Sequence, residues 1–341
     1  MKTKNYLLLA CLAIVPGIFA CKNSTGKTDQ VSSEVRTAVG IPAIDDLSQR
    51  IEASPNNAEL YAARGYLWYE NDNYDEGIAD LEKAIQIDST RPEYYHVLAD
   101  IYMDYYKSRR ALNVMERAGV AFPERIPTLL KLAEFQLILK QYNEALFSLE
   151  RIRRLDPLNA EMFFMFGKVF SEMDKQEQAI AAFQSAVEND PGLIDAWIGL
   201  GNLLSDKGSP IAERYFDNAL RADSNSVEAL HAKAYFLSNK KNDLLGAIAL
   251  YKKINTLNPQ YVDGYFNAGL IYLDMDSIEQ AYKSFDLAIK YEPAFPDAYY
   301  HRGYSAELTG DRQQAMADYK NTLNLDPNYK AAQAGLQRLN Q

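Results

Sequence analysis

The residue types that most often carry catalysis are few in this sequence. Its two cysteines are Cys11 and Cys21, and its three histidines, His96, His231 and His301, stand far apart. No cysteine follows Cys21, which argues against a cysteine–histidine nucleophile, and no glycine-rich phosphate loop is present. Carboxylates are abundant, but surface charge explains most of them. We therefore expect no enzyme activity, no cofactor and no metal site. An unrecognised carboxylate site is the least favoured alternative.

Cys21 lies where an apolar run gives way to a polar one. Residues 1–5 carry two lysines, and residues 7–20 contain no charge. The run is too short to span a bilayer of about 30 Å as a helix, which disfavours a transmembrane anchor. A positive start, an apolar stretch and small residues at its end are typical of a secretory signal peptide. We predict that residues 1–20 are this signal peptide.

Within this layout, Ile18-Phe19-Ala20-Cys21 resembles the lipobox of bacterial lipoproteins. The resemblance implies that the Cys21 thiol carries lipid and becomes the mature N-terminus. Several acyl chains, palmitate among them, would hold such a chain firmly at a membrane. The segment ending in Cys11, Leu8-Leu9-Ala10-Cys11, has the same pattern, but it leaves an apolar region too short for export. With residues 1–20 removed, Cys21 is the only cysteine, so no intramolecular disulfide can form.

The sequence is acidic, with 36 lysines and arginines against 46 aspartates and glutamates. Loss of Lys2 and Lys4 would change the net charge from -10 to -12. Such a surface argues against nucleic acid or anionic lipid head groups as electrostatic partners. Residues 22–40 are small and polar and lack the apolar content that ordering requires. Residues 21–40 are therefore predicted to be a lipidated, flexible tether.

A period of 34 residues dominates the rest of the chain. Prolines recur at this spacing or at twice it, at Pro123, Pro157, Pro191, Pro259, Pro293 and Pro327. Each unit has Gly or Ala at its eighth position, Ala or Gly near the twentieth, and a large apolar residue four residues later. Small residues let two helices approach closely, and bulky ones fill the space beside them. We therefore predict eight helical hairpins, beginning at Ala58, Pro92, Ile126, Ala160, Ile194, Val227, Val262 and Pro296.

The pattern resembles the tetratricopeptide repeat, with its bulky fourth, small eighth, alanine twentieth and proline thirty-second positions. Residues 263–272, DGYFNAGLIY, come close to the family pattern. The resemblance implies an all-α fold, a right-handed solenoid of about eight hairpins over residues 58–329. The fifth unit is one residue short near Gly208, and the sixth is one residue long near Asn242. Both changes fall at the predicted turn between the two helices, where loops tolerate them.

Both ends of the solenoid are predicted to be capped. Residues 330–341 place Ala332, Leu336 and Leu339 on one side of a helix and polar residues on the other. Such a helix covers the last hydrophobic face of a repeat array. Residues 41–57 are predicted to form an N-terminal capping helix in the same manner.

In the tetratricopeptide fold, the second, fifth, ninth, twelfth and thirteenth residues of each first helix look into a concave groove. Aromatic residues gather at these positions toward both ends of the chain. They offer large contact area at low entropic cost, so we expect the groove to take an extended peptide or a partner's helix. Packing against a neighbouring hairpin is the competing explanation for each of them. The candidate groove residues are Tyr66, Tyr69, His96, Phe164, His231, Tyr235, Phe266, Tyr300 and Tyr304.

The second position is acidic in seven of the eight units, at Glu59, Glu93, Glu161, Asp195, Glu228, Asp263 and Asp297. A basic partner would fit this row. However, the helix dipole favours a carboxylate in the first turn by about 0.3–1 kcal/mol whether or not anything binds, and this is the preferred explanation. The family's clamp for acidic C-terminal tails, with lysine fifth and asparagine ninth, is absent from every unit.

Together these features predict a non-catalytic adaptor or scaffold, lipid-anchored in the bacterial cell envelope at the periplasmic face of the outer membrane. Other envelope proteins or peptides are the expected partners, and self-association is left open. The alternative from another class is a cell-wall or glycan-binding lipoprotein, whose tyrosines would stack on sugar rings.

Overall fold

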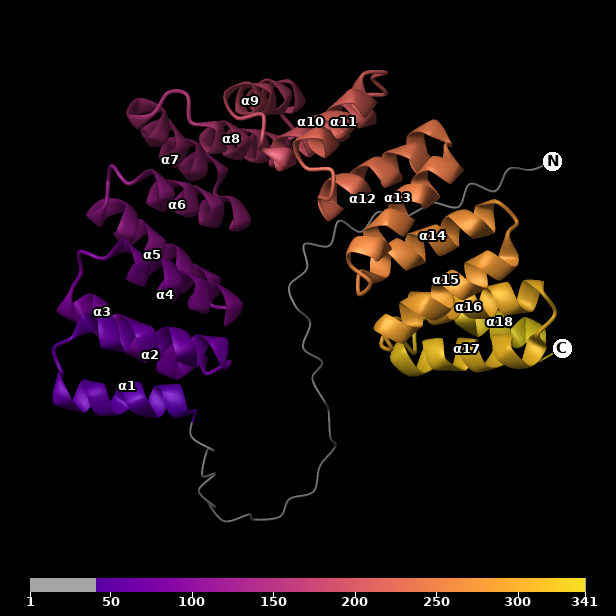
Figure 1. Ribbon diagram of the computed structural model, residues 1–341, viewed down its shortest axis with the longest axis horizontal. Helices are drawn as coiled ribbons and strands as arrows, with labels where there is room; N and C mark the ends of the chain where they lie inside the picture. Colours follow the sequence, from indigo (N-terminus) through magenta and orange to yellow (C-terminus); the bar gives the residue numbers. More distant parts are fainter. Residues whose placement is uncertain (1–40, 341) are drawn as a thin grey trace, which may run out of the picture.

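The computed structural model describes residues 41–340, which form the all-α solenoid that the sequence predicts (Figure 1). This part of the chain contains 18 α-helices and one π-helical turn, and no strand. The predicted signal peptide, Cys21 and the whole of the predicted tether lie outside the described residues. None of the helices within residues 41–340 is long and apolar enough to cross a membrane.

Eight helical hairpins, numbered here one to eight, lie between α1 (Pro42–Ala53) and α18 (Lys330–Leu339). The first helices are α2 (Ala58–Glu70), α4 (Pro92–Asp104), α6 (Ile126–Ile138), α8 (Ala160–Glu172), α10 (Ile194–Asp206), α12 (Val227–Phe236), α14 (Val262–Asp274) and α16 (Pro296–Leu308). The second helices are α3 (Tyr74–Ile87), α5 (Ser108–Ala121), α7 (Tyr142–Leu155), α9 (Gln176–Asn189), α11 (Ala212–Ala222), α13 (Leu244–Leu257), α15 (Ile278–Tyr291) and α17 (Arg312–Leu325).

The small eighth position of each first helix lies against the bulky twenty-fourth position of the second helix. A Cβ atom added at Gly269 would lie 2.6 Å from Cε1 of Phe285, whose side chain is fully buried. Glycine also faces an aromatic ring in hairpins four, five and eight. In hairpins two and three, alanine occupies the eighth position and Met115 or Leu149 the twenty-fourth. The sizes of the two residues are thus matched within each of these hairpins; hairpin one, with Gly65 and Leu81, and hairpin six, with Ala234 and Tyr251, depart from the rule.

Every turn between the two helices of a hairpin contains one residue in the left-handed region. Its φ angle lies between 53° and 84°. It stands two positions after the end of the first helix in every hairpin except the sixth, where it directly follows the π-helical turn. Glycine is favoured in this region because it has no Cβ, yet only two of the eight are glycine. The residues are Asp72, Tyr106, Lys140, Asp174, Gly208, Asn242, Asp276 and Gly310.

The two length changes alter the helices that border the turn as well as the turn itself. In hairpin five, α11 has 11 residues where the other second helices have 14. In hairpin six, the extra residue is accommodated by a π-helical turn, η1 (Leu237–Lys241), which follows α12 directly. A π-helical turn holds one more residue than an α-helical one, so the insertion widens the end of the first helix.

The hairpins form an arch with α1 and α18 at its two ends and α9, α10 and α11 at its crown (Figure 1). First helices of neighbouring hairpins contact one another, as α6 does α8 and α10 does α12, whereas second helices pack mainly against first helices. Elements on the inner side of a curve lie closer together than those on the outer side. The first helices therefore line the concave side, as the family resemblance implies.

A buried ion pair joins the two helices of the last hairpin. Nε and Nη2 of Arg302 donate to the two carboxylate oxygens of Asp318, at 2.9 and 2.7 Å. The Asp318 side chain is 0% exposed and that of Arg302 14%. Arg64 and Asp80 make the same two-point contact in hairpin one, where both N···O distances are 2.7 Å. Such pairs fix the rotation of one helix against the other.

Candidate binding groove

The aromatic side chains at the fifth position lie over the residue at position 24 of their own hairpin. Their ring centroids are 5.7–5.8 Å apart in four hairpins: Phe164 and Phe183, His231 and Tyr251, Phe266 and Phe285, and Tyr300 and Tyr319. Each fifth-position ring is half-buried. These residues therefore take part in hairpin packing, and only the remainder of each side chain is open on the concave side.

Phe266 shows how far this packing role extends. Its ring also lies 4.8 Å from that of Phe295 and 5.6 Å from that of His301, so it is surrounded by aromatic groups from two other helices and a loop. Tyr300 contacts Tyr304, Tyr319 and Tyr329 in a similar cluster. The competing explanation from packing thus applies strongly to the aromatic residues near the C-terminal end.

The tyrosines at the ninth position differ in exposure. Tyr66 is the most exposed of the candidate groove residues, at 46%, and Tyr235 is half-buried. Tyr304 stacks on Tyr300 at 6.4 Å. Tyr66 and Tyr235 come from α2 and α12, so exposed aromatic surface occurs in both arms of the arch.

Four tyrosines form a continuous N-terminal tyrosine cluster, namely Tyr66, Tyr69, Tyr74 and Tyr105. Neighbouring ring centroids lie 6.4, 6.2 and 5.2 Å apart, and the last pair is stacked. The ammonium group of Lys107 lies 3.6 Å from the centre of the Tyr105 ring. Tyr74 and Tyr105 are not among the predicted groove residues; their signal in the sequence is tyrosine directly beside a hairpin turn.

Carboxylates accept hydrogen bonds from this cluster. The Tyr69 hydroxyl donates to Asp104, the Tyr105 hydroxyl to Asp75 at 3.1 Å, and the Tyr74 hydroxyl to Asp72 at 3.1 Å. Burial, together with the Asp104 carboxylate, raises the pKa of Tyr69 well above its usual value. The tyrosines thus remain neutral donors around pH 7, with carboxylates as their acceptors.

The three histidines have separate surroundings. Nε2 of His96 lies 3.0 Å from Oγ1 of Thr128, and Nε2 of His231 lies 3.5 Å from Nδ2 of Asn267. Nδ1 of His301 is buried and has no hydrogen-bond partner within the described chain. Burial lowers the pKa of all three, that of His301 to about 4. All three are therefore neutral at pH 7 and serve as packing groups in different hairpins.

Three of the carboxylates at the second position accept a hydrogen bond from the side chain of the last residue of their own hairpin. That residue directly precedes the next helix. Glu59 accepts from Arg91 at 2.8 Å and Glu93 from Arg125 at 2.9 Å. Asp297 accepts from the hydroxyl of Tyr329 at 2.6 Å. These contacts join each helix to the start of the next first helix or of α18, so these carboxylates have a structural role besides the helix dipole.

The central hairpins lack this tie. Within residues 41–340, Glu161, Asp195, Glu228 and Asp263 make no hydrogen bond to the last residue of their hairpins. The residue at that place is Leu193, Ser226, Tyr261 or Phe295. The acidic row therefore has two parts. In hairpins one, two and eight the carboxylate accepts a hydrogen bond from the last residue of its hairpin, and in hairpins four to seven it does not.

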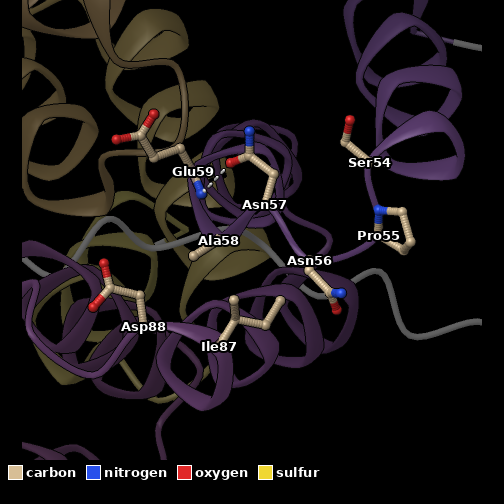
Figure 2. A pocket seen from close by; sticks show the side chains of 8 residues that line it. All are labelled: Ser54, Pro55, Asn56, Asn57, Ala58, Glu59, Ile87 and Asp88. Atoms are coloured by element: carbon tan, nitrogen blue, oxygen red, sulfur yellow. Dashed lines mark hydrogen bonds between the residues drawn. The ribbon is translucent and has the colours of Figure 1, made fainter.

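A pocket of about 610 Å³ lies beside the start of α2 (Figure 2). Residues 54–59 line one side of it, and Ile87 and Asp88 the other. The side chain of Asn57 accepts hydrogen bonds from the backbone N–H groups of Glu59 and Leu60, at 3.0 and 3.4 Å. The amides that could hold an anion at this helix start are thus already bound, which argues against an anion site.

No group of three or more His, Cys, Asp and Glu side chains within residues 41–340 is arranged to hold a metal ion. What the first helices present on the concave side is a series of aromatic surfaces with carboxylates and neutral hydroxyl donors between them. This combination is suited to contact with another macromolecule.

The family model of the tetratricopeptide repeat matches residues 58–91, 160–192, 262–295 and 296–329, which are hairpins one, four, seven and eight. These boundaries agree with the predicted register. The chain thus contains tetratricopeptide repeats at these residues.

Among curated proteins, the chain is similar to the human protein O-mannosyl-transferase TMTC3, at 23% identity over 68% of this chain. It is also similar to the Drosophila melanogaster BBSome complex member BBS4 homolog, at 21% identity over 81% of this chain. The chain covers 26% of the length of the first and 59% of the second.

Among solved structures, the APC/C hetero-tetramer Cut9-Hcn1 contains a chain with the same fold. It has 17% sequence identity and a TM-score of 0.53, over 88% of this chain and 59% of that one. At this identity the likeness supports the solenoid fold alone.

Proposed function

We propose that this protein is a non-catalytic adaptor that binds an extended peptide or a helix of a partner protein on the concave side of its solenoid. The observation that carries the proposal is the row of partly exposed aromatic side chains on the first helices, which includes the exposed Tyr66 and the half-buried Tyr235. Partly buried aromatic residues are the usual anchors of protein interfaces because they lose little entropy on binding. Repeat solenoids of this kind offer an extended concave surface to partners.

Alanine substitution of these two tyrosines tests the groove. Tyr66→Ala with Tyr235→Ala removes aromatic surface from both arms of the concave side. Phe147→Ala is a matched control, because Phe147 is 64% exposed and lies on the second helix α7. Each protein is used in a pull-down from detergent-solubilised envelopes, after circular dichroism has shown that it is folded.

The wild-type protein and the Phe147→Ala variant should recover the same defined proteins, and the double tyrosine variant much less of them. Hot-spot aromatic residues each contribute about 2 kcal/mol or more, so a loss of tenfold or greater is expected. Equal recovery by all three proteins would show that the groove is not the binding surface.

The place of action proposed is the bacterial cell envelope, with the solenoid tethered to a membrane through lipid on Cys21 and facing the periplasm at the outer membrane. The support is the sequence pattern around Cys21, which lies outside the described residues. Metabolic labelling with a palmitate analogue tests it: wild-type protein should carry label, and Cys21→Ser should not. Label that persists in Cys21→Ser would contradict this assignment and point to Cys11.

A further inference from the structure

A second pocket, of about 340 Å³, lies on the outer side of the solenoid, between the second helices α9 and α11. Its place coincides with the irregular hairpin five. Because α11 begins only at Ala212, Ile211 stands before the helix and is 42% exposed at the pocket. The late start of α11 therefore accompanies an opening toward α9.

One part of the pocket lining is aromatic and apolar. Trp197 of α10 and Tyr215 of α11 lie with ring centroids 6.0 Å apart and planes inclined at 41°. The indole Nε1 of Trp197 donates to the carbonyl oxygen of Pro191 at 2.9 Å. Because this bond satisfies the polar atom of the indole and holds the ring in place, Trp197 offers the pocket a fixed apolar surface.

The other part of the lining is polar and carries equal numbers of positive and negative charges. Gln184 and Glu188 are one turn apart on α9, and Arg214 and Asn218 are one turn apart on α11. The side chains of Gln184, Glu188 and Arg214 make no hydrogen bond or ion pair with any other residue of 41–340, although Glu188 and Arg214 have opposite charge. Asn218 accepts from Arg221 through Oδ1 at 2.6 Å, and its Nδ2 group remains a donor.

We propose that this pocket binds a neutral sugar ring. Trp197 and Tyr215 would lie against the C–H surface of the ring, while the four polar side chains exchange hydrogen bonds with its hydroxyl groups. Small-ligand pockets of about 300 Å³ and more combine apolar walls with a few placed polar groups in this way. The site lies on the opposite side of the solenoid from the proposed groove and does not depend on it.

The lining distinguishes a sugar from other occupants. A purely apolar side chain of a partner would cover Glu188 and Arg214 without offering them a hydrogen bond, and burying unpaired charges is costly. A charged ligand would be attracted by one of these two residues and repelled by the other. A neutral ring rich in hydroxyl groups satisfies both the polar part and the aromatic part.

Tryptophan fluorescence gives a direct test, because the sequence contains only Trp68 and Trp197. In a Trp68→Phe variant all tryptophan emission comes from the pocket. This protein is titrated with N-acetylglucosamine, glucose and mannose, and with indole as an apolar probe. Saturation-transfer NMR on the unmodified protein with the same compounds provides the result independently of the Trp68 substitution.

At least one sugar should give a saturable change in emission. Gln184→Ala with Asn218→Ala, which removes two hydrogen-bonding groups and leaves the aromatic wall intact, should raise its Kd about tenfold. Tyr66→Ala, a change in the groove, should leave the Kd unchanged. Absence of saturable binding by all three sugars in both measurements, or saturable binding of indole alone, would overturn the proposal.

Discussion

The substitution Gly269→Ala tests whether the match in size between the residues at the eighth and twenty-fourth positions stabilises each hairpin. A Cβ atom at this site would lie 2.6, 2.8 and 2.9 Å from three carbon atoms of the Phe285 ring. That ring is fully buried, and the rings of Phe266 and His301 lie 5.7 and 5.4 Å from it. Because the ring has no free space to move into, Gly269→Ala should overpack the hairpin.

The expected size of the effect follows from two opposing contributions. Ordinary contact begins at 3.4 Å, so the ring or a helix must move by about 0.8 Å. Overpacking of this kind typically costs about 1–3 kcal/mol, while alanine in place of glycine inside a helix gains about 1 kcal/mol. The free energy of unfolding should therefore fall by about 1 kcal/mol. In a Phe285→Met background, which reproduces the residue type of Met115, the same change should be neutral or stabilising.

Urea denaturation of the wild type, both single variants and the double variant gives this comparison as a double-mutant cycle. A coupling free energy of about 1 kcal/mol or more is expected between the two positions. As a control, Ala99→Gly in hairpin two should lower the free energy of unfolding by about 1 kcal/mol, since the alanine there has no aromatic neighbour at position 24. If Gly269→Ala stabilises both backgrounds equally, the hairpins are not held by this match in size.

Five further changes test other features of the fold. Asp318→Ala leaves the buried guanidinium of Arg302 without its main partner and should lower the free energy of unfolding by about 3 kcal/mol. Glu279→Ala breaks a surface ion pair that is mostly exposed and should lower it by less than about 1 kcal/mol. Equal urea midpoints for the two variants would contradict this. Gly310 has a φ of 84°, so Gly310→Ala should lower the free energy of unfolding by about 1 kcal/mol. Lys140 has a φ of 58°, so Lys140→Gly should have a melting temperature no lower than that of the wild type. A lower melting temperature for Lys140→Gly would count against backbone strain at the turns. Burial holds the pKa of His301 at about 4, against 6.5 for a free histidine, so its contribution to stability is complete above about pH 6.5 and is lost as the pH falls toward 4, by up to about 3 kcal/mol. His301→Phe should therefore flatten the pH dependence of the urea midpoint in this range, and an unchanged profile would refute the assignment.

The hairpins and their register were predictable because their signals are local and recur at a fixed interval. A small residue at Gly269 and a large one at Phe285 are needed wherever two helices cross closely, so they mark each hairpin in the sequence. The left-handed turn residues were not predictable in the same way. At Tyr106 and Lys140 the closing of the hairpin imposes a backbone conformation that these residue types do not favour, so the residue types carry no signal of it.

The groove residues were predictable only in part. The register places Phe164 and Phe266 on the concave side, but it does not tell how much of each ring the neighbouring helix covers. The N-terminal tyrosine cluster joins Tyr74 and Tyr105, which are 31 residues apart, and the outer pocket depends on where α11 begins. Both arise from packing between hairpins, for which the repeat pattern holds no information.

The hydrogen bonds between the second-position carboxylate and the last residue of a hairpin restrain the angle between successive helices. They are present in hairpins one, two and eight. The central hairpins lack them and also contain the shortened α11 and the π-helical turn. Bending under load should therefore concentrate at the crown of the arch, while the two arms move as levers. A small change of angle at the crown then becomes a large change in the distance between α1 and α18, so that a partner bound across both arms would set the span of the arch.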